Sequence, residues 1–397
     1  MKIKRLALTL LAWTGLLMFS GCDQIDEADT AGTNQKDTAA EYFVSTDGND
    51  SADGTFDAPF QTLQKALSVV KPGERVYLRG GSYPVGVTIS VSGTEDEPIT
   101  IESFQEEKVV FVGPYGEDKI YDTDRNLFDD SLVVLGNWLI LKDFEVKNAA
   151  QGMYVGGGAS HNRFENLSLH DNYWGGLILT DGAAYNTVIN CDAYRNYDAN
   201  THGQHADGFD IRGRSTDTIP YVGEGNRFVA CRSWENADDG YDCWEAGNAI
   251  VFIDCLAYDN GNNIWDDDDF QGDGNGFKLG IHNRDGYPRD RHEVIGCKAW
   301  KNAGWGFDSN DNIVGMEIRQ NVAWDNRLSF KFIYGPHHLI ENVSIDSGVN
   351  YIDGNATEEN NSWNGVAYTI ESFDDTAIRG DRDRDGNVTV DGFLEVL

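Results

Sequence analysis

Short apolar runs separated by turn residues recur along the first third of the chain. Runs of this length, bounded by Gly, Asp and Asn, predict β-strands joined by tight turns. The expected strands begin at Glu41 and continue at Val76–Gly81, Ile99–Ile101, Val109–Val112 and Leu132–Leu135. The chain is therefore expected to be mainly β structure from Glu41 onward.

From Asn166 onward the pattern becomes a repeat. A small or polar residue is followed by x-(Ala/Ser)-(aromatic or aliphatic)-x-Asn, in copies that open at Cys191, Cys231, Cys255, Cys297 and Asn321, with weaker copies at Asn166 and Asn342. The basic period is 21 to 25 residues, with two enlarged copies. A period near two dozen, made of short strands and turns, predicts a single-stranded parallel β-helix in which equivalent residues stack ~4.8 Å apart.

This fold gives the repeated residues structural roles. The cysteine that opens most copies predicts a ladder of small thiols pointing into the core. The asparagine that ends the repeated phrase predicts a second ladder at a turn, made by Asn196, Asn236, Asn260, Asn302 and Asn326. Apart from Cys22 there are five cysteines and no Cys-x-x-Cys pair, which argues against a disulfide framework and against zinc. The apolar spacing of Pro59–Leu67 predicts a short helix that caps the open N-terminal end.

A second phrase, Gly-aromatic-ionisable, follows the ladder asparagine in each copy. Its third position reads Ile178, Asp210, Asp242, Lys278, Asp308 and Lys331 along successive coils. The aromatic residue before it should point to the opposite side, into the core. Lys278 is therefore expected about one coil spacing from Asp242 and from Asp308.

Further carboxylates, Asp207, Asp238 and Asp239, lie just ahead of this stack. A surface ladder of alternating charges is the simplest interpretation of such a stack. However, these acids are too many for one lysine to balance, and four or five oxygens from adjacent coils suit a hard cation such as calcium. The residues alone do not decide between Asp207 and Asp210 as a ligand.

Two insertions, 197–206 and 261–275, flank the coil that carries Asp238 and Asp242. They are expected to wall a cleft above it.

The net charge of −35, from 31 basic and 66 acidic residues, argues against nucleic acid or an anionic membrane as partner. An acidic sugar would need a locally neutralised site, which bound calcium provides. A calcium ion beside a lysine then suggests proton abstraction next to a carboxylate. In a uronate polymer, Lys278 would take the C5 proton and the 4-linked sugar would leave by β-elimination.

The N-terminus predicts export. Basic residues precede the apolar run Leu6–Phe19 and the sequence Ser20-Gly21-Cys22, so residues 1–22 are expected to be a lipoprotein-type signal peptide. Residues 23–40 are polar and suit a flexible tether. The enzyme is expected outside the cell or on its surface, held to the membrane only by a lipid on Cys22.

The motif phrases resemble polysaccharide lyase family 9, which includes pectate lyases. They appear as His205-Ala-Asp207-Gly-Phe209, Asp238-Asp239-Gly-Tyr-Asp242, Gly274-Asn-Gly-Phe-Lys278-Leu-Gly280 and Gly306-Phe-Asp308-Ser-Asn310. The resemblance covers roughly Glu41 to the end. It implies a right-handed parallel β-helix, calcium ligands at Asp207, Asp238, Asp239 and Asp242, and the Brønsted base at Lys278. It also favours Asp207 over Asp210, and polygalacturonate (pectate) as substrate.

Several points stay open in the sequence. Asp308, Asn310 and Lys331 are candidates for orienting substrate, and Arg212, Arg284, Arg289 and Trp305 are further possible sugar contacts. The acidic run Asp266–Asp269 has no counterpart in the resemblance and is expected to be a solvated loop. Asp381–Val388 mimics the start of a calcium-binding loop, but Gly392 occupies its twelfth position, so residues 41–397 are interpreted as one lyase domain.

Other functions fit the same fold. The alternatives are a lyase acting on rhamnogalacturonan or alginate, a glycoside hydrolase with two carboxylates, and a carbohydrate-binding solenoid without catalysis. A monomer is expected, because the cap and the C-terminal segment should cover both ends of the solenoid.

Overall fold

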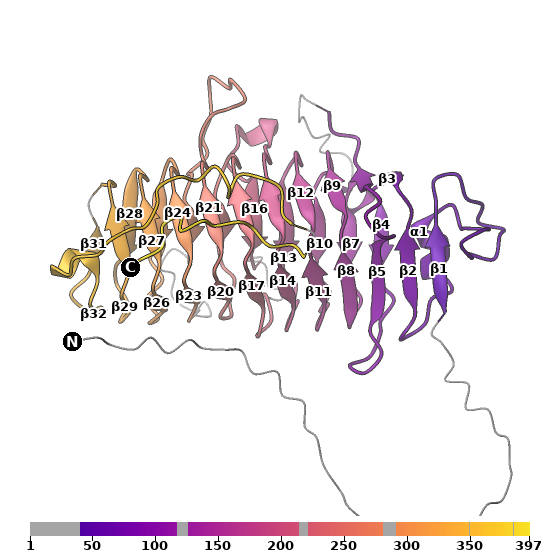
Figure 1. The fold of residues 1–397 in the computed structure, drawn as a ribbon, viewed down its shortest axis with the longest axis horizontal. Coiled ribbons are helices and arrows are strands. Elements are labelled where there is room, and N and C mark those ends of the chain that lie inside the picture. Colours follow the sequence, from indigo (N-terminus) through magenta and orange to yellow (C-terminus); the bar gives the residue numbers. More distant parts are fainter. Residues whose placement is uncertain (1–39, 117–125, 214–220, 281–290, 349, 384) are drawn as a thin grey trace, which may run out of the picture. The chain divides into compact units, whose positions relative to one another are not determined.

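The structure is a computed structural model that describes residues 40–397 apart from 117–125, 214–220, 281–290, 349 and 384. The predicted signal peptide, nearly all of the predicted tether, Arg284 and Arg289 lie outside the described residues. The described chain forms three sheets (Figure 1).

Sheet 1 has twelve strands: β1 (Glu41–Val44), β2 (Arg75–Leu78), β5 (Ile99–Ser103), β8 (Leu139–Lys142), β11 (Arg163–Glu165), β14 (Thr187–Ile189), β17 (Arg227–Val229), β20 (Val251–Ile253), β23 (Glu293–Ile295), β26 (Glu317–Arg319), β29 (His338–Ile340) and β32 (Thr357–Glu359). Sheet 2 has ten strands: β4 (Val87–Ile89), β7 (Leu132–Val134), β10 (Met153–Val155), β13 (Gly175–Leu179), β16 (Asp207–Ile211), β19 (Tyr241–Asp242), β22 (Phe277–Lys278), β25 (Trp305–Asp308), β28 (Leu328–Phe332) and β31 (Tyr351–Ile352). Sheet 3 has ten strands: β3 (Gly81–Pro84), β6 (Val109–Val112), β9 (Glu145–Lys147), β12 (Ser168–His170), β15 (Asp192–Tyr194), β18 (Arg232–Trp234), β21 (Leu256–Tyr258), β24 (Lys298–Trp300), β27 (Val322–Trp324) and β30 (Val343–Ile345). Four short helices complete the described elements: α1 (Leu63–Leu67) and the 3₁₀ helices η1 (Leu127–Asp130), η2 (Ala199–Thr201) and η3 (Ser362–Asn364).

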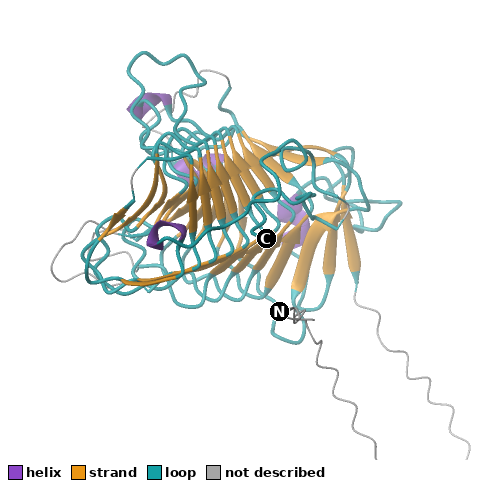
Figure 2. Cartoon of the chain, turned by 60° about the vertical axis from the view of Figure 1, so that its left-hand side comes forward, coloured by secondary structure: helices purple, strands orange, loops and turns teal. Residues whose placement is uncertain are grey.

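Each regular coil contributes one strand to each sheet, and each strand pairs in parallel with its equivalents one coil away. Figure 2 shows these strands side by side along the stack. The predicted parallel β-helix is therefore confirmed. The strands expected at Glu41, Ile99, Val109 and Leu132 are all present.

The interior is a stack of equivalent side chains. Phe209, Tyr241, Phe277, Phe307 and Phe330 stack face to face on neighbouring coils, with ring centroids 4.6 to 5.0 Å apart. Cys191, Cys231, Cys255 and Cys297 lie fully buried in the same core as free thiols. Both the inward aromatic residues and the thiol ladder are thus as predicted.

The asparagine ladder is continuous. The Nδ2 of Asn196 donates to the Oδ1 of Asn236 at 2.8 Å, and the same bond repeats from Asn236 to Asn260, Asn302 and Asn326 at 2.9 to 3.0 Å. The next residues of the chain must pass close to this ladder. A Cβ on Gly240 would lie 2.9 Å from the Nδ2 of Asn260 and 2.7 Å from the Gly276 carbonyl oxygen, so only glycine fits there.

One repeat boundary was predicted wrongly. Ser168 pairs with Asp192, which places Leu167, and not Asn166, in register with Cys191. Asn172 then continues the asparagine ladder, because its backbone N–H donates to Asn196. Asn166 instead adopts a left-handed turn with φ of 53°.

The cap and the C-terminal segment were expected to cover the two ends of the solenoid, but the contacts of the C-terminal segment lie along its side. Helix α1 begins at Leu63 rather than Pro59, because the side chain of Thr62 caps it, and it buries Leu63, Ala66 and Leu67. The C-terminal segment runs back along sheet 3 (Figure 1). There Arg382 donates to Asp192, and Phe393 packs edge-to-face on Trp300 at 4.8 Å. Within the described residues no helix has the length and apolar character needed to cross a bilayer.

Candidate active site

The predicted stack of ionisable residues is present on the outer face of sheet 2. Strand pairing places Ile178, Asp210, Asp242, Lys278, Asp308 and Lys331 directly beside one another in that order. This register follows from the core. The residue before each of them, Leu177 in the first coil and an aromatic residue in the others, is fixed inside, so the next residue must face outward.

A cluster of buried carboxylates surrounds one end of this stack. Asp207 opens β16, Asp242 lies on β19, and Asp238 and Asp239 occupy the turn before β19; all four are at most 4% exposed. The cluster is held by backbone donors. Asp239 N–H donates to Asp207 Oδ1 at 3.0 Å, and Trp244 N–H donates to Asp242 Oδ1 at 2.8 Å. The carboxylates thus keep their places on adjacent coils.

Lys278 reaches into this cluster. Its Nζ lies 2.9 Å from Asp239 Oδ2, 3.5 Å from Asp242 Oδ2 and 3.4 Å from Asp273 Oδ2. The ring of Trp244 lies beside it, with its centroid 5.6 Å from Nζ. The residue is 8% exposed, so its side chain is largely shielded from water.

Arg212 forms ion pairs with two of the buried acids, Asp207 and Asp210. Its guanidinium pairs with Asp210 Oδ1 and lies 3.3 Å from Asp207 Oδ2, while its Cζ lies 5.8 Å from the ring centroid of Trp174. Asp210 is fully buried and its Oδ2 accepts no hydrogen bond from the described residues. Arg212 is therefore a partner of the acids.

Negative charge is in excess here. Among the described residues, the five buried carboxylates of Asp207, Asp210, Asp238, Asp239 and Asp242 have two cations beside them, Lys278 and Arg212. Burial raises the pKa of Asp239 to about 6 even though Lys278 pulls it down, and burial with mutual repulsion raises the pKa of Asp207 and of Asp238 well above normal. Burial lowers the pKa of Lys278, but attraction to Asp239 and Asp242 outweighs it and raises that pKa well above normal. Such a cluster is stable only if further positive charge enters it.

The arrangement fits a divalent cation. Carboxylate oxygens of Asp207, Asp239 and Asp242 lie within 4.8 Å of one another, and a second such group joins Asp238, Asp239 and Asp273. All donors are hard oxygen atoms on rigid coils, which suits calcium rather than a metal that prefers nitrogen or sulfur.

The second insertion, residues 261–275, supplies contacts that the repeat pattern did not predict. Asp273 N–H donates to Asp238 Oδ1 at 2.7 Å. The backbone N–H and the Nδ2 of Asn275 both donate to Asp239 Oδ1, at 2.7 and 2.8 Å. The only sequence signal was their place just before the Gly-Phe-Lys phrase. They show that this insertion holds the carboxylates in place.

The two insertions flank the coil as expected, and they also meet above its turn. Tyr197 stacks on Trp265 at 4.7 Å and its hydroxyl donates to Asp267 Oδ2 at 2.7 Å. Ala237 lies in the same apolar cluster as Tyr197. Asp267 is thus a structural residue, whereas Asp266, Asp268 and Asp269 are exposed, as expected of a solvated loop.

The other candidate residues lie further along the stack. Asp308 pairs with Lys331 at 3.3 Å and accepts a hydrogen bond from the backbone N–H of Asn310 at 2.7 Å. The side chain of Asn310 donates to the Gly280 carbonyl oxygen at 2.9 Å. These contacts place Asp308 and Lys331 one and two coils beyond Lys278 in the direction of the C-terminus.

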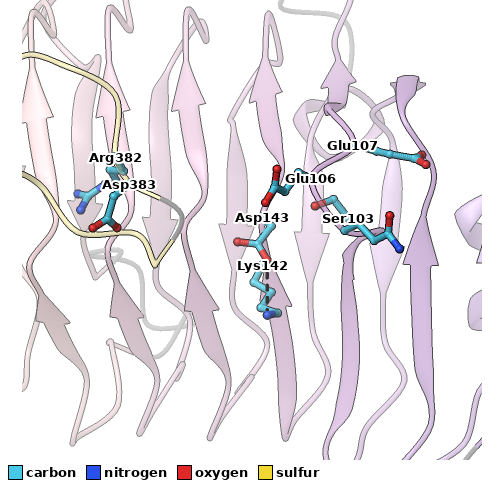
Figure 3. Close-up of a pocket in the computed structure, with 8 residues that line it drawn as sticks. Ser103, Glu106, Glu107, Lys142, Asp143, Arg382 and Asp383 are labelled. Atoms are coloured by element: carbon cyan, nitrogen blue, oxygen red, sulfur yellow. Dashed lines mark ion pairs between the residues drawn. The ribbon is translucent and has the colours of Figure 1, made fainter.

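A separate cleft of about 1080 Å³ lies on the other side of the molecule. Lys142 and Asp143 line it from the end of β8, and Arg382 and Asp383 line it from the C-terminal segment (Figure 3). Its acids already have partners: Lys142 pairs with Asp143 at 3.5 Å, and Asp383 accepts hydrogen bonds from the backbone of Asp385 and Asn387. The buried cluster at Lys278 therefore remains the better candidate.

The sequence profile described as Pel9A-like, right-handed β-helix region matches residues 42–361. The chain belongs to this Pel9A-like family. Membership confirms the resemblance to polysaccharide lyase family 9, the right-handed fold and the expectation of an enzyme. Pectate lyase L of Dickeya dadantii is 34% identical over 366 residues, which cover 87% of this chain and 81% of that protein. Pectate lyase PEL9 of Emericella nidulans is 33% identical, over 90% of this chain and 92% of that protein.

Two solved structures share the Pel9A-like fold closely. The crystal structure of pectate lyase Pel9A has a TM-score of 0.79 at 33% identity and covers 90% of this chain and 89% of that one. A rhamnogalacturonan lyase has a TM-score of 0.77 at 26% identity and covers 90% of this chain and 96% of that one. Relatives with different substrates therefore share this scaffold.

Proposed function

We propose that the protein is a calcium-dependent polysaccharide lyase that cleaves polygalacturonate by β-elimination, with Lys278 as the base. The observation that carries this proposal is the position of Lys278. Its amine is the one lysine nitrogen within reach of the buried carboxylate cluster among the described residues. Membership in the Pel9A-like family and the pectate lyase relatives support the same reaction.

In this proposal the ligands are Asp207, Asp238, Asp239 and Asp242. Calcium held by them would neutralise their charge and provide a positive partner for the carboxylate of a uronate substrate. Asp210 remains outside the ligand set because Arg212 already compensates it. Asn275 and the backbone N–H of Trp244 orient two of the ligands.

Lys278 would act on the sugar directly. A cation bound by the acids that raise the pKa of Lys278 would cancel their charge and favour its neutral amine. The neutral amine takes the C5 proton, the electron pair of that bond forms the C4–C5 double bond, and the C4–oxygen bond breaks to release the next sugar. The proton acceptor must be shielded but reachable, and Lys278, a residue that is 8% exposed with its Nζ 5.6 Å from the Trp244 ring centroid, fits both conditions. Asp308, Asn310 and Lys331 are proposed to orient the substrate beyond this point.

A second substrate deserves equal testing. The rhamnogalacturonan lyase covers as much of this chain as pectate lyase Pel9A does, at 26% against 33% identity. A rhamnogalacturonan substrate would use the same base and the same cation, because it also contains uronate residues.

The experiment is a panel of polygalacturonate, rhamnogalacturonan and alginate, each with calcium or with chelator. A lyase produces unsaturated uronate ends that absorb in the ultraviolet, whereas a hydrolase produces saturated ends. Calcium-dependent absorbance on polygalacturonate is expected. Saturated products would indicate a hydrolase, and no cleavage of any polymer would leave the carbohydrate-binding solenoid as the better interpretation.

The N-terminal sequence supports a further part of the proposal, namely export as a lipoprotein anchored through Cys22 and followed by a tether of residues 23–40. The lyase domain would then comprise residues 41–397 and act as a monomer at the cell surface. Fractionation tests this directly, because Cys22→Ala should move the protein from the membrane fraction to the soluble one.

A further inference from the structure

An exposed tyrosine, Tyr351, lies on the same outer face of sheet 2 as Lys278 and contacts the half-buried Trp305. Tyr351 is in register with Lys331, which is in turn in register with Asp308 and Lys278. The tyrosine is 55% exposed, and its ring centroid lies 5.5 Å from that of Trp305 with an interplanar angle of 79°. The stack that contains the proposed base therefore ends in an aromatic surface.

The core does not account for this tyrosine. Its neighbour Ile352 packs against the core, so Tyr351 must face outward from the strand. Trp305 contacts it edge-to-face and so restricts its orientation while leaving much of the ring exposed. A restrained, exposed ring with a polar hydroxyl offers a large contact area at low cost in conformational entropy.

The charges beside the pair indicate what it binds. Lys331 lies 3.3 Å from Asp308 and 3.9 Å from Asp311, so its ammonium is shared between two carboxylates. Among the described residues, Lys331 therefore offers this surface no surplus positive charge with which to attract a sugar carboxylate. Recognition here must come from contact between the aromatic rings and the C–H face of a sugar.

The distance between Tyr351 and Lys278 indicates which sugar of the polymer the tyrosine would contact. Three coil steps of ~4.8 Å separate Tyr351 from Lys278, or about 14 Å, which corresponds to roughly three pyranose units. A polysaccharide that lies along sheet 2 with its scissile bond at Lys278 would therefore contact Tyr351 only if it extends roughly three sugar units beyond that bond.

We propose that Tyr351 and Trp305 form a distal subsite that stacks on a sugar ring about three units from the bond cleaved at Lys278. The proposal rests on the proposed function for the identity of the polymer. It adds that the protein distinguishes long from short uronate oligosaccharides through ring contact and not through charge. Trp305 positions Tyr351 in this subsite.

The test measures binding in the catalytically disabled Lys278→Ala protein, so that no substrate is consumed. Galacturonate oligomers from the disaccharide to the hexasaccharide are titrated by calorimetry in the presence of calcium. Tyr351→Ala is compared with Tyr185→Ala, because Tyr185 is 45% exposed and stacks on His161 in a turn away from sheet 2.

The expected result is a loss of affinity that depends on length. Tyr351→Ala should weaken binding of the longest oligomers about 3- to 10-fold and leave the shortest unchanged. Tyr185→Ala should change neither, and raising the salt concentration should not reduce the effect. Equal losses at every length, or no loss at any length, would overturn the subsite. Cleavage by the unmodified protein is scored separately, so absence of lyase activity would refute the proposed function without deciding the subsite.

Discussion

Calcium should stabilise the folded protein, because in the described part of the chain five buried carboxylates at Lys278 have two cations beside them. Removing calcium with chelator leaves this surplus uncompensated. An ion that binds only the folded state adds RT ln(1 + [L]/Kd), or about 2.7 kcal/mol at a hundredfold excess over Kd. For about 360 folded residues the unfolding entropy is ~0.75 kcal/mol/K, so the expected rise in Tm is about 4 °C.

Differential scanning fluorimetry with and without calcium measures this shift, and two variants locate it. Asp242→Asn removes a proposed ligand and should reduce the shift to about 1 °C or less. Asp383→Asn alters the loop that resembles a calcium-binding motif but lies in the C-terminal segment, and it should retain the full shift. If the unmodified protein shows no calcium-dependent Tm, or if Asp383→Asn abolishes the shift while Asp242→Asn keeps it, the cation site is not at Lys278.

Two further predictions concern the scaffold. Burial alone raises the pKa of Asp375, but hydrogen bonds from Arg379 and Trp300 lower it to about 2. Because this pKa is below that of the unfolded chain, the stabilisation is present above about pH 4 and is lost as the pH falls through 2. Asp375→Asn should therefore lower the free energy of unfolding in urea by about 1 kcal/mol at pH 7 and leave it unchanged near pH 2. Gly240→Ala should cost about 1 to 3 kcal/mol and reduce activity, because its Cβ would press on the Gly276 carbonyl, whereas Gly354→Ala, with nothing within 4 Å, should be neutral in the same assay.

The repeat made much of the site predictable. Each coil of a β-helix places equivalent residues one above another, so aligning the Gly-aromatic-ionisable phrases gave the true order from Ile178 to Lys331. The thiol and asparagine ladders followed for the same reason. The alignment failed at Asn166 because asparagine does open the copies at Asn321 and Asn342, whereas in this coil Leu167, the next residue, occupies that register.

The insertions were not predictable in the same way. Asp273 and Asn275 reach Asp238 and Asp239 only because residues 261–275 fold back over the turn, and no repeat fixes the shape of that loop. The same holds for Asp267, which lies in an acidic run but bonds to Tyr197. Arg212 was a possible sugar contact in the sequence, and its burial between Asp207 and Asp210 depends on tertiary packing.

The role of Lys278 is tested most directly by its own replacement. Steady-state formation of unsaturated uronate ends on polygalacturonate with calcium is compared for the unmodified protein, Lys278→Ala and Lys331→Ala. Because the base is needed for the chemical step, Lys278→Ala should lose at least about a thousandfold in kcat with its calcium-dependent Tm shift retained. Lys331→Ala removes a proposed substrate contact and should mainly raise KM, with a much smaller loss of kcat. Activity in Lys278→Ala close to that of the unmodified protein would contradict the assignment of this lysine as the base.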